Sequence, residues 1–230
     1  MSVNEANEIA NRIGEIQDSI ADAARAAGRA PGDVTLLAVS KKQSAERVRA
    51  AYDAGLRAFG ENYVQGLEEQ AALLPADAQW HFIGHLQSKK AKRVAGVALV
   101  HSVDSLKLAS KLASAAELLG RPLPCLLNIN ISNEDSKSGI VPDQALPLLE
   151  LVAALPHIRV QGFMCIPSPD EEPRHAFSRL RELRDQAQRA SGLPLPELSM
   201  GMSGDFADAI AEGSTIVRVG TAIFGPRNLP

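Results

Sequence analysis

Apolar residues near the start of the chain recur with the spacing of an α-helix. Ile9, Ile13, Ile16 and Ile20 follow one another at steps of four, three and four residues, which places them on one face of an amphipathic helix. The pattern stops near Gly28, a residue type that commonly ends helices. The sequence therefore predicts an N-terminal helix over residues 1–28 whose apolar face packs on the rest of the chain.

Beyond Gly28, short apolar runs alternate with longer segments of helical spacing. Runs rich in aliphatic and β-branched residues are typical of strands that are buried on both faces. Helical patterns between these runs cover residues 44–54, 62–74, 105–119 and 174–190. The predicted strands are Val34–Ser40, Ala58–Gly60, Trp80–Gly84, Leu99–Val103, Pro124–Ile131, Val160–Ile166, Leu198–Gly201 and Thr215–Gly220.

Eight strands, with a helix after each of the first seven, predict a (β/α)8 TIM barrel with an additional N-terminal helix. Alternation of strand and helix requires a parallel sheet, because a parallel return needs a crossover. An open doubly wound sheet is the alternative, but no Gly-x-Gly-x-x-Gly loop follows the first strand. We expect one domain over residues 1–230, with residues 1–28 packed on the barrel.

Composition excludes several classes of protein. Hydrophobic residues make up 45% of the chain and charged residues 22%, as in globular proteins. The net charge of −3, without a dense basic run, argues against nucleic-acid binding. The lysine-rich segment 89–93 has helical spacing and is typical of a solvated face, with a phosphate contact as the alternative. Because no signal peptide or membrane-length apolar stretch is present, we expect a cytoplasmic protein without membrane contact. No apolar stripe is evident beyond the N-terminal helix, so we expect a monomer. Cys125 and Cys165 lie in apolar runs and are expected to be buried free thiols.

Candidate functional residues come at the ends of the predicted strands, where barrel enzymes carry their sites. Lys41 directly follows the first strand. An amine held against apolar walls loses hydration, its pKa falls, and it can form a Schiff base with an aldehyde. A solvated lysine, like its neighbour Lys42, is the alternative. Other strand ends contribute Asn62, His81, Gly84, Asn128, Asn130 and Met164.

The segments after the last two strands are typical of phosphate sites. Barrels often bind phosphate between these two loops, through backbone amides and a helix N-terminus. Residues 201–205 open a predicted helix at 206–212, and Gly220 and Thr221 leave the eighth strand. Ser203 and Thr221 add hydroxyl donors. A helix cap and a turn glycine are the alternatives for the two segments.

Arg218 lies two residues before Gly220, so both face the same side of the eighth strand. A buried arginine must donate to an acceptor. An unprotonated pyridine nitrogen would serve, and so would a carboxylate elsewhere in the barrel. An aldehyde-reactive lysine, a phosphate site and an arginine donor together predict a pocket for pyridoxal 5′-phosphate (PLP).

An ordered set of segments resembles the YggS/PROSC family of pyridoxal phosphate homeostasis proteins, which is related to the N-terminal barrel of alanine racemases. The resemblance runs from about Val34 to Gly225, with departures at residues 42–44 and at Lys89 that we interpret as changes at the rim. The segments are Ala38–Lys41, Phe59–Gln65, Trp80–Gly84, Leu86–Ser88, Asn128–Ile131, Ser136–Gly139, Gly201–Ser203 and Arg218–Gly225.

The resemblance implies that Lys41 forms the Schiff base and that Asn62 and Arg218 lie near the pyridine ring. It also implies that Ser203, Gly220 and Thr221 lie at the phosphate. A second amine, Lys137, falls in the polar loop after the fifth strand, where it would assist PLP entry or exit or form a surface salt bridge. The predicted cofactor-binding residues are Lys41, Asn62, His81, Met164, Ser203, Arg218, Gly220 and Thr221.

Holding PLP is distinct from catalysis. A PLP racemase needs an acid or base on each face of its substrate. Alanine racemases use a tyrosine from an additional C-terminal domain, which we do not expect here. Tyr52 and Tyr63 fall in predicted helical segments, and Tyr63, which adjoins Asn62, is the alternative candidate. Arg218 beside the pyridine nitrogen would also weaken the electron sink. We predict no catalytic residue and no metal, and a protein that buffers PLP and delivers it to apo-enzymes. A weak amino-acid racemase and a Schiff-base aldolase are the alternatives.

Overall fold

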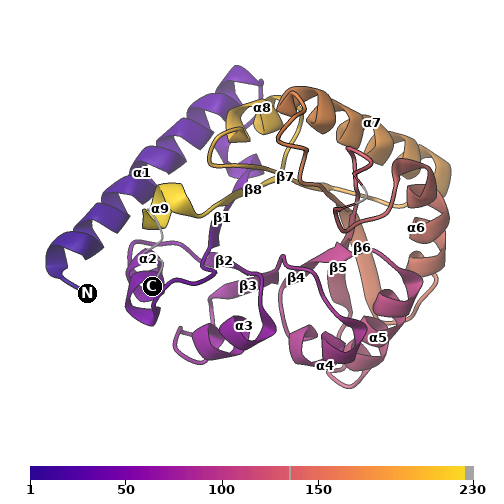
Figure 1. Cartoon of the computed structure of the whole chain (residues 1–230), viewed down its shortest axis with the longest axis horizontal. Coiled ribbons are helices and arrows are strands. Elements are labelled where there is room, and N and C mark those ends of the chain that lie inside the picture. The colour runs from indigo at the N-terminus through magenta and orange to yellow at the C-terminus, as the bar shows by residue number, and fades with distance from the viewer. Residues whose placement is uncertain (135, 226–230) are drawn as a thin grey trace.

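The computed structural model describes residues 1–134 and 136–225. Its eight strands are parallel and pair in chain order, and β1 also pairs with β8, so the sheet closes into a barrel (Figure 1). Closure confirms the predicted barrel fold and excludes the open doubly wound sheet. The strands are β1 (Thr35–Val39), β2 (Ala58–Glu61), β3 (Gln79–Phe82), β4 (Leu99–Val103), β5 (Leu123–Asn128), β6 (Ile158–Met164), β7 (Glu197–Met202) and β8 (Ile216–Val219).

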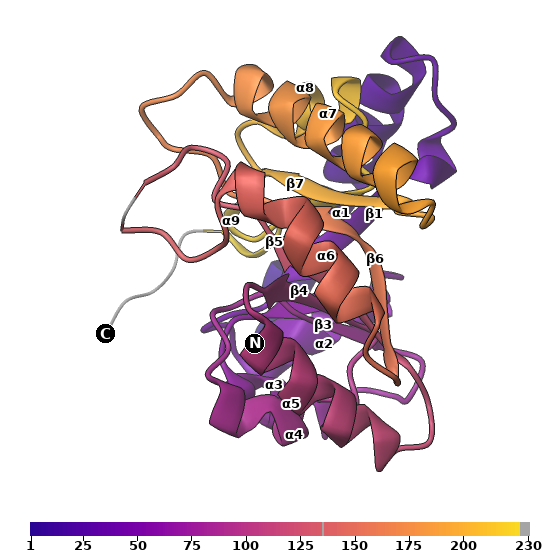
Figure 2. The ribbon, with the colours of Figure 1, turned by 90° about the vertical axis from the view of Figure 1, so that its right-hand side faces the viewer.

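Helices cover the outside of the barrel and connect successive strands (Figures 1 and 2). A short helix after β8, α9, lies beyond the predicted set. The α-helices are α1 (Val3–Ala26), α2 (Ala45–Asp53), α3 (Val64–Ala71), α4 (Ala91–Val94), α5 (Leu106–Glu117), α6 (Ala145–Ala153), α7 (Pro173–Ser191), α8 (Phe206–Ala211) and α9 (Thr221–Phe224), and the 3-10 turns are η1 (Pro31–Asp33), η2 (Ser88–Lys90) and η3 (Pro142–Gln144). No helix in the described ranges is both long and apolar enough to cross a bilayer.

The helix α1 lies against α2, α8 and α9, across the first and last strands of the barrel (Figure 1). The Oγ atom of Ser2 accepts a hydrogen bond from the amide of Glu5, which caps the start of the helix. Its apolar stripe is buried as predicted, with Ile9 and Ile13 at most 1% exposed. The helix therefore adds apolar contact where the barrel closes.

The barrel encloses a small apolar cluster. Its buried members are Leu37, Ala58, Leu99, Leu126, Met164 and Ile216. Side chains two positions apart on a strand face the same side of the sheet. Asn128, after Leu126, and Arg218, after Ile216, are therefore directed inward, toward the C-terminal end of the barrel. The interior changes from apolar to polar toward that end.

The fifth strand is shorter than the sequence predicts. It ends at Asn128 rather than at Ile131, so Asn130 lies in the following loop. The Asn130 side chain donates to the carbonyl of Glu134 (2.8 Å) and accepts from its amide (3.1 Å). Such local bonds between an asparagine side chain and the backbone compete with strand pairing, which explains the early end of β5.

Both cysteines are buried and free, as expected. Cys125 and Cys165 are 0% exposed, and burial raises the pKa of each thiol to about 12. The two thiols are therefore protonated at neutral pH.

Truncation of the α1 stripe tests its contribution to stability. The substitution Ile13→Ala should lower the free energy of unfolding by about 2–4 kcal/mol, because Ile13 is 1% exposed and the cavity would persist. The exposed control Val3→Ala should change it by about 0.5 kcal/mol or less. Urea unfolding measures both, and equal effects would contradict this account of α1.

Candidate functional site

Lys41 follows β1 on a turn at the C-terminal end of the barrel, where it is half-buried. The preceding residue, Ser40, is buried and donates from Oγ to Oε1 of Glu61 (3.0 Å). Burial raises the pKa of the Glu61 carboxyl, while hydrogen bonds from Ser40 and the backbone and the positive charge of Lys41 oppose this rise. The candidate amine therefore lies within the electrostatic reach of a buried carboxyl group.

Sequence reasoning did not single out Glu61. The sequence did contain a sign of its importance, because Glu61 is the one ionisable residue in the short buried strand β2. Its Oε2 atom accepts from the amide of Asn62 (3.1 Å), so the carboxyl group connects the end of β1 to the segment that carries Asn62. Glu61 is a positioning residue for both predicted site residues.

Gly84 allows the chain after β3 to approach the end of β2. A Cβ atom at this position would lie 2.0 Å from the backbone oxygen of Asn62, a distance that no side chain tolerates. The loop after β3 can therefore lie directly on Asn62. The predicted Trp80–Gly84 motif thus has a structural function in placing Asn62.

A cavity of about 230 Å³ lies at this end of the barrel. Two of its lining atoms, Asn62 Oδ1 and Ser102 Oγ, are buried without a hydrogen-bond partner among the described residues. Unpaired buried polar atoms cost free energy, so this cavity suits a ligand that offers polar partners. The lining includes the predicted residues Asn62 and Met164, together with Ser102, Asn128, Asn130 and Lys137.

Ser102 was missed because its position depends on an irregularity in the sheet. The pairing of β4 with β5 shifts in register between Val100 and Val103. A β-bulge of this kind redirects a side chain, and strict alternation from the interior residue Leu99 would place Ser102 on the outer face. The local sequence pattern carries no signal of this shift.

Arg218 is buried in the barrel, 5% exposed, and its acceptors are neutral. Its Nη1 atom donates to the carbonyl oxygen (2.7 Å) and Oγ (2.8 Å) of Ser199, and Nη2 donates to the carbonyl of Cys165 (2.8 Å). Within residues 1–134 and 136–225, Arg218 forms no ion pair with a carboxylate, so the carboxylate alternative is wrong for this part of the chain. The cation keeps its charge for a ligand.

Two histidines extend this network across the barrel. Nδ1 of His101 lies 2.9 Å from Ser199 Oγ, and Nε2 of His101 lies 2.9 Å from Nδ1 of His81. Burial lowers the pKa of His81 to about 4. Burial also lowers the pKa of His101 well below its usual value, and electrostatic repulsion from His81 and Arg218 adds to this effect. Both imidazoles are therefore neutral at pH 7.

His81 contacts His101 and has 6% of its surface exposed. It is not among the described residues that line the mouth cavity, and its predicted contact with the cofactor stays a prediction. His101 and Ser199 were not predicted as site residues, because a polar residue inside an apolar run gives no sign of its partner across the barrel.

The predicted phosphate segments lie side by side at the ends of β7 and β8. Met202 is paired with Arg218 in register, which places Ser203 next to the end of β8. Gly201 has a φ of +91°, and a Cβ atom there would lie 2.5 Å from the Cβ of Ala209, so the glycine allows α8 to approach. A Cβ atom on Gly220 would lie 3.4 Å from Val39. Gly220 and Thr221 therefore leave the barrel beside the end of β1, close to Lys41.

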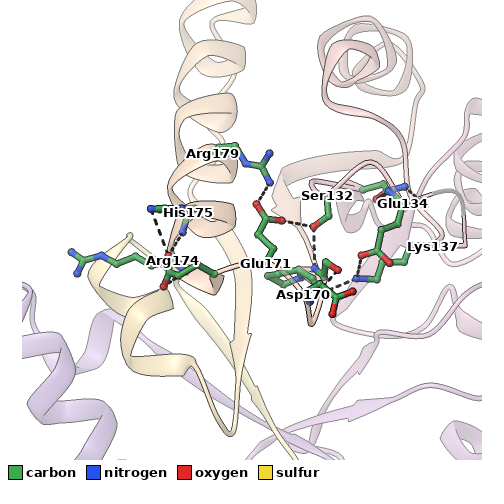
Figure 3. Close-up of polar contacts among 12 residues, drawn as sticks. Ser132, Glu134, Lys137, Asp170, Glu171, Arg174, His175 and Arg179 are labelled. Atoms are coloured by element: carbon green, nitrogen blue, oxygen red, sulfur yellow. Dashed lines mark hydrogen bonds and ion pairs between the residues drawn. The ribbon is translucent and has the colours of Figure 1, made fainter.

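The loops after β5 and β6 are joined by polar contacts at the rim (Figure 3). Nζ of Lys137 pairs with Glu134 (2.6 Å) and donates to the carbonyl of Pro167 (2.8 Å). Ser132 donates to Glu171 (2.7 Å) and accepts from the amide of Ser168 (3.0 Å). Lys137 thus forms the predicted surface salt bridge while it also lines the cavity.

Comparison with known proteins agrees with this arrangement. Residues 15–228 match the family "Alanine racemase, N-terminal domain". The pyridoxal phosphate homeostasis protein of Pseudomonas aeruginosa is 48% identical over 96% of both chains, and that of Escherichia coli is 42% identical over 96% of this chain and 98% of its own.

The chain belongs to the family of pyridoxal phosphate homeostasis proteins. This confirms the resemblance given by the sequence motifs. Among solved structures, PipY of Synechococcus elongatus with PLP bound is 35% identical, with a TM-score of 0.82 over 94% of this chain and 100% of that chain. The roles of the individual site residues remain predictions.

The low pKa of His81 predicts a pH dependence of stability. Between pH 6.5 and about 4 the unfolded chain binds a proton that the folded chain excludes. The free energy of unfolding should therefore fall as the pH falls through this window, by roughly 3 kcal/mol for this group. His81→Gln should reduce the slope in urea unfolding without removing it, because His101 still titrates. An unchanged slope in the variant would contradict the assignment.

Proposed function

We propose that this chain binds PLP at the C-terminal mouth of its barrel, holds it as a Schiff base with Lys41, and buffers and delivers it without a dedicated reaction. The observation that carries the proposal is the PLP-bound PipY structure, whose whole length matches 94% of this chain. The names of the relatives support a role in PLP homeostasis.

Lys41 supplies the amine for attachment. Condensation of its Nζ with an aldehyde forms one C=N bond and releases one water, and hydrolysis or attack by another amine reverses the step. Lys41 lies within electrostatic reach of the buried Glu61, because its charge opposes the rise in the pKa of that carboxyl. Since hydrolysis and amine exchange both reverse the condensation, Lys41 would hold the aldehyde reversibly.

The other residues supply donors that suit the remaining groups of PLP. Arg218 has five N–H donors and neutral acceptors from Ser199 and Cys165, so its charge is available to a pyridine nitrogen, which it would keep unprotonated. The amides and hydroxyls of Ser203 and Thr221, beside Gly220, would hold the phosphate. Asn62 Oδ1 lacks a partner among the described residues and would receive one from the ligand.

Two observations favour a carrier over a racemase. Tyr52 donates to Asp77 on the outside of the barrel, and Tyr63, the N-cap of α3 rather than a residue within it, is 57% exposed. Among the described residues that line the cavity there is no tyrosine to serve as a second acid or base. The fixed charge of Arg218 also opposes protonation of a pyridine ring, which a good electron sink requires.

Delivery would proceed by exchange of amines. An incoming amine that attacks the C=N bond would release Lys41 and carry the aldehyde away, and apo-enzymes that use PLP are the expected recipients. Lys137 lines the cavity and would assist this passage once its pair with Glu134 opens.

Spectroscopy of the purified protein tests the attachment. The protein incubated with PLP should show the visible imine band, and Lys41→Ala should abolish it. The control is Lys42→Asn, because Lys42 has a φ of +60° that asparagine tolerates, and it should keep the band. Borohydride reduction followed by peptide mapping should place the pyridoxyl group on Lys41. A reduced adduct on another amine, or none, would refute the Schiff-base assignment.

An activity assay separates the carrier from the racemase. With excess PLP, conversion of L-alanine to D-alanine should not exceed the rate of Lys41→Ala. Transfer of bound PLP to an apo-aminotransferase should be faster than the spontaneous release of PLP. Lys41-dependent turnover of alanine would reject the carrier in favour of the racemase.

A further inference from the structure

A second and larger groove lies on the outer surface of the barrel, between α5 and the segment formed by η2 and α4. Its volume is about 830 Å³. The helices α4 and α5 lie next to each other at the same side of the barrel (Figures 1 and 2). Nothing in the proposed PLP site uses this surface.

The groove is lined by four exposed lysines, Lys89, Lys92, Lys107 and Lys111. The chain has eight lysines and a net charge of −3, so half of its lysines line one groove of an otherwise slightly acidic protein. Lys107 and Lys111 are four residues apart on α5 and share one helix face. Four of the chain's lysine side chains are therefore gathered along one groove.

These lysines differ in their contacts from several arginines at the surface. Arg49, Arg57 and Arg93 each pair with a carboxylate. In the described part of the chain, none of the four groove lysines has an ion-pair partner, and no acidic residue lines the groove. The groove therefore offers positive charge to a partner without first breaking internal pairs.

The rest of the lining fits a protein segment better than a nucleic acid. Ala91 and Ala115 form an apolar floor, and Leu118 is 72% exposed at one end. Nucleic-acid sites commonly use aromatic stacking and arginine forks, and the described lining has neither an aromatic residue nor an arginine. Lysines around small apolar patches match an amphipathic chain with acidic and aliphatic side chains.

One loop, the connection after β3, contributes residues both to the groove and to the mouth cavity. Gly84 and His85 line the mouth cavity, and Gln87 and Ser88, from the same connection after β3, line the groove. A protein bound in the groove would therefore contact the loop that lies on Asn62.

We propose that the α4–α5 groove docks an acidic, amphipathic segment of a partner protein. The stripe from Lys107 to Leu118 is about 16 Å long at 1.5 Å per helical residue, which suits a segment of about a dozen residues. Docking here would hold the partner beside the mouth of the barrel, and this consequence rests on the proposed PLP function. Binding of the segment to the groove does not depend on that function.

Fluorescence anisotropy tests the docking. The probe is a labelled peptide of about a dozen residues that combines glutamate with leucine, titrated with the full-length protein at about 0.01 M salt, where the Debye length is roughly 30 Å. Binding should weaken as salt rises to about 0.15 M. The variant K107E/K111E should weaken it at least about tenfold.

The control R159E/R189E changes the net charge equally, at two exposed arginines outside the groove, and should bind the peptide as the parent does. Equal weakening in this control, or no binding at low salt, would overturn the proposal. Tighter binding of an oligothymidylate of the same length would replace it with a nucleic-acid site. The imine band of each preparation reports PLP binding separately, so a failure of docking is distinguishable from a failure of the proposed function.

Discussion

The pairing of β1 with β8 is the constraint on which the site depends. Ala38 is paired with Val219, so Lys41 and Gly220 leave neighbouring strands at the same end of the barrel although they lie far apart in the sequence. Bringing the two ends of the chain together costs loop entropy. The apolar face of α1, packed against α2, α8 and α9, stabilises the closure. Burial of Ile9 and Ile13 therefore helps to hold Lys41 and Gly220 together, although neither isoleucine lies in the candidate site.

Arg218 determines the electrostatics inside the closed barrel. Its charge is solvated by the carbonyls of Ser199 and Cys165 rather than cancelled by a carboxylate among the described residues. A protonated His101 would repel this cation. Burial, together with the charge of Arg218, therefore lowers the pKa of His101 well below its usual value. The interior thus holds one fixed positive charge next to neutral imidazoles. Such a site favours a ligand that presents a lone pair or a negative charge and disfavours one that presents a proton.

Elements that show a local pattern of apolar residues could be predicted from the sequence. Side-chain positions that depend on contacts between different strands could not. The stripe of Ile9 to Ile20 and all eight strands could be located, because burial repeats at fixed spacing along each element. The strand-end rule also selected Asn62, which lines the mouth cavity, and Arg218, which is buried inside the barrel; their roles stay predictions. Ser102 could not be found, since a register shift between β4 and β5 turns it toward the cavity. The contact of His101 with Ser199 joins distant strands, and no pattern within one strand encodes it.

The connection after β3 joins the mouth of the barrel to the α4–α5 groove. Gly84 lies so close to the backbone of Asn62 that a Cβ atom would clash at 2.0 Å, so the loop packs directly on the segment that carries Asn62. The same connection continues into the groove through Gln87 and Ser88. A partner that binds this groove and shifts the loop would alter the placement of Asn62, and hence the affinity of the mouth for its ligand. Because linkage is reciprocal, a ligand that fixes Asn62 would change the affinity of the groove by the same factor.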